Sequence, residues 1–372
     1  MTISKNLIRM TLIGLMLIVI KPAHAQMNES TPTESVAVDV VKKPEFNWFP
    51  IVFWTPETKF LGGVILGYSV PHTVHGLEAH SSEISLPFIY TQQNQVMSAL
   101  EADHYWNDEL NRIRLTAEFV RFEEDYYGIG NATEKSAKEQ FTPQNLLIQA
   151  NYFRNFRSHL YVGAQYEFNA YKVTASERDG MIANLPHQGT SLLSGVGAAG
   201  YWDTRNNEVY PRTGSYHQVS VVSFSGLTGS DKTFTRTIVD VRRYFKVTNT
   251  HVLAVQFYGS SIAGHAPMYK LALFGGQNVM RGYYGGRYRD NHMMAVQAEY
   301  RMPLVWRFGI TAFGGYGDVA HRINDFNTKD LKYSTGVGIR FLLDKKTNRN
   351  IRIDLAFGKH SAQPAIGIGE AF

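Results

Sequence analysis

The sequence has no cysteine among its 372 residues. This absence excludes disulfide bridges, thiolate metal sites and cysteine nucleophiles together. It also excludes an N-terminal cysteine that could carry a lipid anchor. The chain must therefore be stabilised without covalent cross-links between side chains.

Long apolar runs are missing after the first 25 residues, where none approaches the roughly 18 residues of a membrane helix. Residues 1–25 are predicted to be a secretory signal peptide. Lys5 and Arg9 precede the apolar run 10–20, and Ala23 and Ala25 flank one residue at a small-residue cleavage site. A short membrane anchor is the alternative, although the run is too short to span a bilayer.

A large excess of one charge is also absent. The formal net charge is +5, and the cations Lys5, Arg9 and Lys21 lie in or beside the predicted signal, which has no acidic residue. Without residues 1–25 the charge falls to +2. No basic cluster remains that could neutralise phosphates, so the sequence predicts no nucleic-acid partner.

Aromatic residues and strict alternation are what the sequence does contain. It has 21 Tyr, 22 Phe and 5 Trp. The segments 112–119, 160–169, 333–341 and 351–357 alternate apolar residues with charged, amide or glycine residues. A period of two is the signature of a strand with one apolar face. A transmembrane β-barrel explains the pattern, and a secreted soluble β-sandwich is the competing interpretation.

The connections between the predicted strands favour the barrel. Long connections at 123–142, 173–189 and 264–290 lie on one side, and tight turns such as 107–108 and 344–348 lie on the other. Short periplasmic turns and long surface loops are typical of outer-membrane barrels. The fold class is therefore predicted to be all-β, a transmembrane antiparallel barrel of sixteen strands over 46–372, after a disordered periplasmic leader at 26–45. The strands are predicted at 48–55, 60–70, 80–91, 94–106, 110–122, 143–156, 158–172, 190–203, 214–226, 232–247, 250–263, 291–303, 306–319, 331–343, 349–358 and 364–372.

The last predicted strand ends on an aromatic residue, Phe372. A terminal aromatic that closes the final strand is the expected sorting signal of such barrels. Phe372 is therefore predicted to serve as the C-terminal sorting signal.

Three stretches resemble the superfamily of outer-membrane assembly and translocation barrels, which includes the bacterial surface antigen proteins. The first is the stretch Trp202–Tyr216, WDTRNNEVYPRTGSY. It is similar to the family's D-x-R…P-x-x-G turn through Asp203, Arg205, Pro211 and Gly214. Pro and Gly enforce a turn, and an Asp side chain can accept hydrogen bonds from the backbone just ahead. By strand parity this turn is periplasmic.

The second stretch is MRGY, Met280–Tyr283, inside the glycine-rich connection 264–290. It resembles the family's V-R-G-F/Y motif at the tip of the sixth surface loop. The resemblance implies that this loop folds into the lumen. Arg281, followed by Gly282 and Tyr283, would then meet an acid on the inner wall, and Glu299 matches that acid.

The third stretch, AFGGYGDVA at 312–320, resembles the family's F-x-D-x-G pattern and departs from it. Phe313 and Gly317 match, but Gly315 stands at the acid position. Asp318 has the opposite parity and is not expected to replace it. The sequence therefore predicts that Arg281 lacks one carboxylate partner, so that its attachment to the wall is weaker or depends on Glu299 alone.

Other motifs carry weaker signals. GVGAAG at 195–200 matches a dinucleotide-binding string but lies inside a predicted strand with no helix after it. His72, His75 and His80 lack the acids or cysteines of a convincing metal site. His104 beside Asp103 is the nearest approach to a catalytic pair. The sequence predicts no enzyme activity, no cofactor and no metal.

The function that the resemblance implies is insertion or translocation of polypeptide, or of lipid, at the bacterial outer membrane. A weak seam between the strands 48–55 and 364–372 would open for the client. Family members usually carry polypeptide-transport-associated domains before the barrel, and the leader 26–45 is too short for one. Expected partners are outer-membrane lipid, unfolded outer-membrane proteins, and a second copy or an accessory periplasmic protein. A plugged structural or partner-binding barrel and a passive pore are the alternatives.

Overall fold

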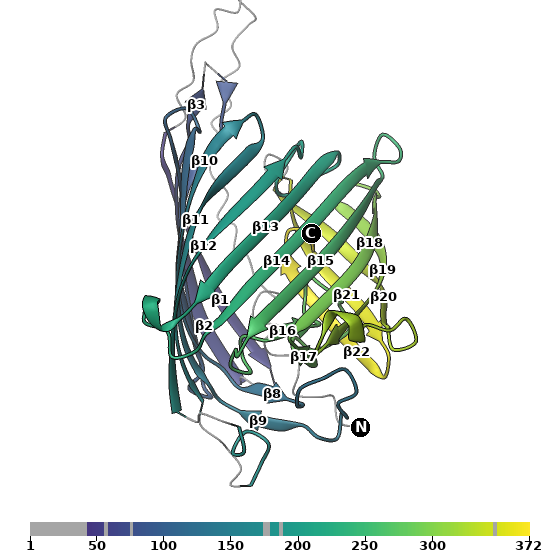
Figure 1. Cartoon of the computed structure of the whole chain (residues 1–372). Helices are drawn as coiled ribbons and strands as arrows, with labels where there is room; N and C mark the ends of the chain where they lie inside the picture. The colour runs from purple at the N-terminus through teal and green to yellow at the C-terminus, as the bar shows by residue number, and fades with distance from the viewer. Residues whose placement is uncertain (1–42, 56–58, 75–76, 174–178, 186–188, 345–347) are drawn as a thin grey trace, which may run out of the picture.

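The computed structural model describes residues 43–372 except 56–58, 75–76, 174–178, 186–188 and 345–347. The predicted signal peptide, most of the predicted leader, and His75 lie outside the described residues. The chain forms one large antiparallel sheet of sixteen strands that follow one another in sequence order (Figure 1). The predicted barrel fold and its sixteen strands are confirmed.

The strands of the large sheet begin and end within a few residues of the predicted positions. They are β1 (Glu45–Thr55), β2 (Lys59–Val70), β5 (Ser82–Thr91), β6 (Val96–Trp106), β7 (Asn111–Arg121), β10 (Gln144–Arg157), β11 (Leu160–Val173), β12 (Gly189–Asp203), β13 (Gly214–Phe224), β14 (Phe234–Lys246), β15 (Val252–Gly264), β18 (His292–Pro303), β19 (Phe308–Ala320), β20 (Lys332–Asp344), β21 (Arg349–Gly358) and β22 (Ser361–Ile368).

Three small hairpins lie outside the large sheet, in the connections. The hairpin of β3 (Thr73–Val74) and β4 (Leu77–Glu78) lies at one end of the barrel. The hairpins of β8 (Glu124–Tyr126) with β9 (Glu139–Phe141), and of β16 (Ala272–Phe274) with β17 (Tyr288–Asp290), lie at the other end (Figure 1). Two 3-10 turns, η2 (Gly226–Thr228) and η3 (Ile323–Asp325), complete the elements of the described residues. We call the β3–β4 end periplasmic, following strand parity, and the opposite end the surface end.

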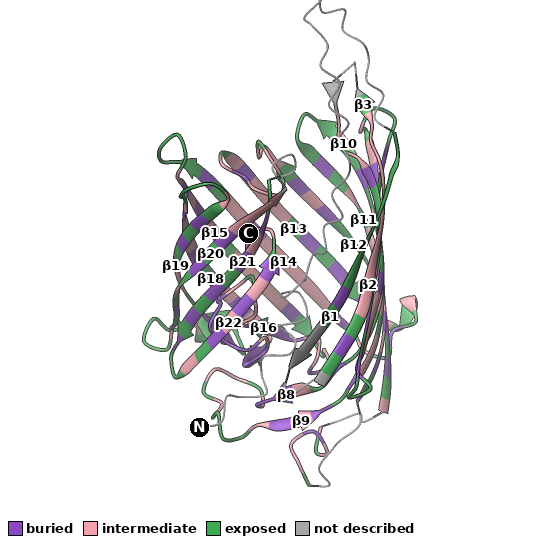
Figure 2. Cartoon of the chain, turned by 180° about the vertical axis from the view of Figure 1, so that it is seen from behind, coloured by how far each residue is buried: buried purple, intermediate pink, exposed green. Residues whose placement is uncertain are grey.

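The two faces of each strand differ as the period of two predicts. In β18 the outward Val296 is 52% exposed, whereas the inward Glu299 and Arg301 are buried. Figure 2 shows buried and exposed positions following one another along the strands of the sheet. Outward apolar side chains suit contact with lipid tails. These inward side chains of β18 are polar yet dry, which requires that protein rather than water covers them.

No helix among the described residues is long and apolar enough to cross a membrane.

The large sheet is not closed into a ring. Its order begins with β1 and ends with β22, and no backbone pairing joins these two strands in the described part of the chain (Figure 2). Each edge strand contains a proline, Pro50 in β1 and Pro364 in β22. Proline has no N–H to donate to a ladder and is confined mostly to edge strands. The composition of both strands therefore agrees with their place at the edges.

Candidate functional site

The connection between β15 and β18, residues 265–291, covers the inner wall of the barrel. Its hairpin β16–β17 and its tip contribute Phe274, Met280 and Tyr283 to a buried apolar cluster. That cluster also contains Met293 of β18 and Val319 of β19. The loop is thus held in the lumen by a core of its own, as the resemblance implied.

Arg281 lies at the centre of this loop and is 1% exposed. Its Nη2 is 2.7 Å from Oε2 of Glu299, and its Nη1 is 2.6 Å from Oδ2 of Asp354. The guanidinium carbon lies 3.5 Å from the centroid of the Phe313 ring, in cation–π geometry. Two carboxylates and one ring therefore surround a single cation, and we call this arrangement the Arg281 latch.

The prediction that Arg281 lacks a second carboxylate partner was wrong, because Asp354 of β21 supplies one. Asp354 is inward by the alternation of 351–357, but sequence alone does not show that β21 faces the loop tip. Asp318 does not contact Arg281, as its parity predicted, and pairs with Lys332 instead. The missing signal was the pairing of β20 with β21, which places Asp354 opposite Gly338.

Gly315, at the position where the family has an acid, leaves space for Gln297. A Cβ at Gly315 would come within 2.8 Å of the Gln297 Cβ. The Gln297 carboxamide donates to the main-chain oxygen of Asn278 at 2.7 Å and accepts the N–H of Met280 at 3.1 Å. Met280 has a φ of +53°, a conformation that non-glycine residues rarely adopt. Gln297 therefore holds the backbone that presents Arg281.

Glycines of the wall make room for the loop. Side-chain atoms at Gly336, Gly338 or Gly358 would overlap, respectively, with Phe313, Asp354 and Tyr283. The Tyr283 hydroxyl donates to the main-chain oxygen of Tyr333 at 2.8 Å and accepts the N–H of Lys359 at 2.6 Å. Gly282 has a φ of +99° and its Cα faces the backbone of β21. The glycines that follow Arg281 and line β20 and β21 are thus required by close approach of the loop.

Ion pairs continue from the latch toward the periplasmic end. Arg340 contacts Asp354 at 2.6 Å and Glu370 at 2.8 Å. Arg301 contacts Glu299 at 2.8 Å through its Nε. All of these side chains are at most 5% exposed. Because removing one member would leave a buried charge with fewer partners, the network is expected to hold the loop rigidly.

Phe372 lies apart from the sheet, which corrects the predicted last strand. β22 ends at Ile368, four residues before Phe372, which is only 4% exposed. Its ring packs in a cluster with Tyr244 and Ala254, and its main-chain oxygen accepts a hydrogen bond from Arg301 at 2.7 Å. Phe372 therefore does not close the last strand in the folded barrel; its predicted role in sorting remains a prediction about the unfolded chain.

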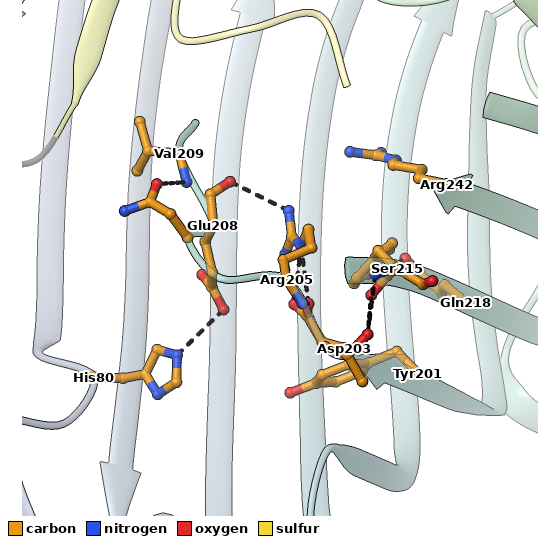
Figure 3. Close-up of polar contacts among 12 residues, drawn as sticks. His80, Tyr201, Asp203, Arg205, Glu208, Val209, Ser215, Gln218 and Arg242 are labelled. Atoms are coloured by element: carbon orange, nitrogen blue, oxygen red, sulfur yellow. Dashed lines mark hydrogen bonds and ion pairs between the residues drawn. The ribbon is translucent and has the colours of Figure 1, made fainter. Parts of the chain in front are cut away.

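The turn between β12 and β13 contains the other predicted motif (Figure 3). The Asp203 carboxylate accepts the Arg205 main-chain N–H at 3.0 Å and its guanidinium at 2.6 Å. Gly214 has a φ of +98°, and a Cβ there would overlap with the Thr204 carbonyl. The Pro211 carbonyl accepts a hydrogen bond from Arg301 at 3.4 Å. The motif residues thus shape the turn, and Pro211 connects it to the ion-pair network of the latch.

His80 ties this turn to its neighbour, the turn before β5. Its Nε2 lies 3.5 Å from Oε1 of Glu208 (Figure 3). Its Nδ1 lies 2.9 Å from Oε1 of Glu109. The hydrogen bond to Glu208 raises the pKa of His80 to about 9, against the opposing effect of burial. Burial alone would raise the pKa of Glu208, but His80 and nearby arginines lower it to about 2.

The His80–Glu208 tie is expected to weaken at high pH. His80 has a pKa above its ordinary value of 6.5, so its contribution is complete below pH 6.5 and is lost as the pH rises through about 9. Glu208 contributes above its ordinary 4.5 and loses its effect toward pH 2. Both side chains are more than 40% exposed, so solvent screens the pair and its effect is local.

Spin labels can measure this tie, because the chain has no native cysteine. Labels at the exposed positions Thr73→Cys and Thr213→Cys should give a narrow distance distribution at pH 6 and a broad one at pH 10. With Glu208→Gln the distribution should be broad at both pH values. If the distance distribution had the same width at pH 6 and pH 10 in the labelled chain with Glu208 intact, the proposed His80–Glu208 contact would be contradicted.

The residues of the weaker motifs, GVGAAG and the histidines, do not assemble into a binding or catalytic site within the described part of the chain. GVGAAG lies inside β12, where Gly195 faces the Phe224 ring. Asp103 binds Arg112 rather than His104, and His104 and His72 both contact the Ser82 hydroxyl. Among the described residues, no three His, Asp or Glu side chains gather as metal ligands.

Most of the chain matches a known protein family. Residues 81–366 match the family model described as the Omp85 superfamily domain. This chain belongs to the Omp85 superfamily. Membership implies a bacterial outer-membrane location for this Omp85 barrel. No curated protein sequence matches the chain significantly.

Two solved structures share the Omp85 fold with this chain. A crystal structure of BamA from Haemophilus ducreyi lacking POTRA domains 1–3 aligns with a TM-score of 0.58 and 12% identity, covering 88% of this chain and 69% of that one. CdiB from Acinetobacter baumannii aligns with a TM-score of 0.56 and 10% identity, covering 88% of this chain and 60% of that one. At these identities the likeness concerns the fold.

Proposed function

We propose that this Omp85 barrel inserts or translocates polypeptide at the outer membrane through the seam between β1 and β22. The observation that carries the proposal is the open sheet, whose two edge strands have no pairing with each other in the described residues, beside a lumen occupied by residues 265–291. An unpaired strand edge is a template for another chain. A client would therefore enter at the seam rather than through the lumen, and lipid is a second cargo that the same opening would admit.

Two features weaken the seam. Pro50 and Pro364 remove one donor from each edge. β22 has eight residues, fewer than the roughly 9–11 that a tilted strand needs to cross the bilayer. A short strand at the edge favours a locally thinned membrane, which lowers the barrier to insertion.

The latch connects the loop to the seam. Gly282 rests on the backbone of β21 at Ala356 and Phe357, and Arg281 holds Asp354 of the same strand. β21 is the only pairing partner of β22 within the described sheet. The docked loop therefore supports the strand on which the seam depends.

A second candidate is a plugged barrel with a structural or partner-binding role. The dry network around Arg281 favours it, because a rigid occupied lumen would serve that role equally well. The same occupied lumen argues against a wide passive pore. In both proposals the barrel works without catalysing a reaction and without a resident cofactor, alone or with a second copy or an accessory periplasmic protein.

Client folding in liposomes distinguishes the two candidates. We expect liposomes containing the purified barrel to accelerate folding of an added unfolded outer-membrane protein severalfold over empty liposomes. Arg281→Ala should reduce the acceleration, as should a Pro50→Val, Pro364→Val variant that restores donors at the seam. Heat-modifiable gel mobility verifies that each variant is folded. A rate equal to that of empty liposomes would refute autonomous insertion and favour the plugged barrel.

A further inference from the structure

A cavity of about 450 Å³ lies at the periplasmic end of the barrel, between the turn 204–213 and the ends of β18 to β21. Four arginines line it: Arg212, Arg301, Arg307 and Arg340. Asparagines from two turns and from β21 line it as well: Asn206, Asn207, Asn348 and Asn350. None of the described residues that line the cavity is acidic.

The two inner arginines are already neutralised. Arg301 pairs with Glu299 at 2.8 Å, and Arg340 pairs with Glu370 at 2.8 Å. Both carboxylates lie behind the cavity wall rather than in it. Their positive charge is therefore largely compensated by the latch network.

The two outer arginines have no carboxylate partner in the described part of the chain. Arg212 donates through Nη2 to the Asn249 carbonyl, and its buried Nε has no partner within the described ranges. Arg307 donates through Nη1 to the carbonyls of Leu342, at 3.1 Å, and Leu343, at 2.9 Å. Carbonyl dipoles do not cancel a full charge, so both guanidinium groups leave positive charge at the cavity.

One further polar group in the wall lacks a partner. Thr311 is 2% exposed and lines the cavity, and its Oγ1 has no hydrogen-bond partner among the described residues. A buried hydroxyl without a partner costs free energy that a bound ligand would recover. The cavity thus combines uncompensated cations, neutral amides and an unsatisfied hydroxyl.

From these features we infer that the cavity binds a phosphate group. The planar fork of arginine matches phosphate oxygens, and hydrogen bonds between charged partners are about twice as strong as neutral ones. Amides and a hydroxyl complete such a site without adding negative charge. The volume exceeds that of a phosphate ion, so the group can carry a small substituent such as glycerol.

The adjoining turn favours a phospholipid headgroup as the source of the phosphate. Trp306 lines the cavity and is 75% exposed, beside Val305 at 76% and Leu304 at 56%. Exposed Trp at the end of a membrane strand is typical of the headgroup level. A headgroup of the inner leaflet could therefore reach the cavity over this turn. The site does not depend on polypeptide insertion, so it can bind phosphate whether or not the proposed function holds.

Binding calorimetry on the full barrel in neutral detergent tests the site with three probes: inorganic phosphate, short-chain phosphatidylglycerol, and the matching diacylglycerol without phosphate. We expect phosphatidylglycerol to bind and diacylglycerol not to bind. Arg212→Gln and Arg307→Gln should each weaken binding about tenfold, the effect of losing one charged hydrogen bond. Arg243→Gln is the matched control, since Arg243 lies at the same end, donates a hydrogen bond to the Ser215 hydroxyl, and is not among the described residues that line the cavity.

The pattern of binding among the three probes identifies the source of the phosphate. Binding of both inorganic phosphate and phosphatidylglycerol indicates a general phosphate site, and binding of phosphatidylglycerol alone indicates a headgroup site. Either result supports the inference if Arg243→Gln leaves it unchanged. Absence of binding by both probes overturns the inference, as does an equal loss in Arg243→Gln, which would mean that any cation at this end suffices.

Discussion

Arg281→Ala is expected to lower the free energy of unfolding of the barrel by about 3 kcal/mol. Breaking a buried ion pair by removing one partner typically costs about 3–5 kcal/mol. The low end of this range is expected for Arg281→Ala, because Arg340 still contacts both Glu299 and Asp354 after the substitution. Urea unfolding in lipid vesicles, followed by gel mobility, measures the difference.

Arg287→Ala provides the matched control for this prediction. Arg287 lies in the same loop and is 9% exposed, but it bonds the hydroxyl and the carbonyl of Thr133 rather than a carboxylate. Its removal should cost clearly less than that of Arg281. Arg281→Lys should also be destabilising, because a single ammonium cannot reproduce the fork that reaches two carboxylates. If Arg281→Ala and Arg287→Ala lowered the free energy of unfolding equally, the ion pairs of the Arg281 latch would add no stability beyond that of an ordinary loop contact.

Gly358→Ala is expected to cost about 1–3 kcal/mol and to displace the loop tip, although it adds only one methyl group. That methyl would overlap with the ring of Tyr283, which is fully buried and cannot move into solvent. Thermal unfolding and limited proteolysis of the loop would report the two effects. Gly62→Ala is the control, because a Cβ at Gly62 meets no atom within 4 Å.

A second substitution isolates the cause of this loss. In a Tyr283→Ala background the added methyl has space, so Gly358→Ala should then cost almost nothing. Residues in contact show such coupling, whereas distant residues add independently. Additive effects of the two substitutions would mean that Gly358 is needed for a reason other than the loop.

The latch itself could be predicted only in part. Arg281 and Glu299 were expected to meet through the resemblance and strand parity, and the structure places them 2.7 Å apart. Asp354 was visible only as an inward residue of its strand. Its contact with Arg281 depends on how far the loop descends along β20 and β21. The two residues lie 73 positions apart in the chain, so a single sequence does not reveal that they meet.

The sequence by itself determined the sixteen strands, their order and their inward and outward faces. The alternation of apolar and polar residues and the residues that favour turns are local features of the sequence. Each strand could therefore be predicted without knowing which strands pair with it. Only the tertiary structure decided the second carboxylate of the latch, the inward place of Phe372, the tie between His80 and Glu208, and the cationic cavity. Each joins side chains that are distant in the chain, and their meeting depends on strand register and on how loops fold into the lumen.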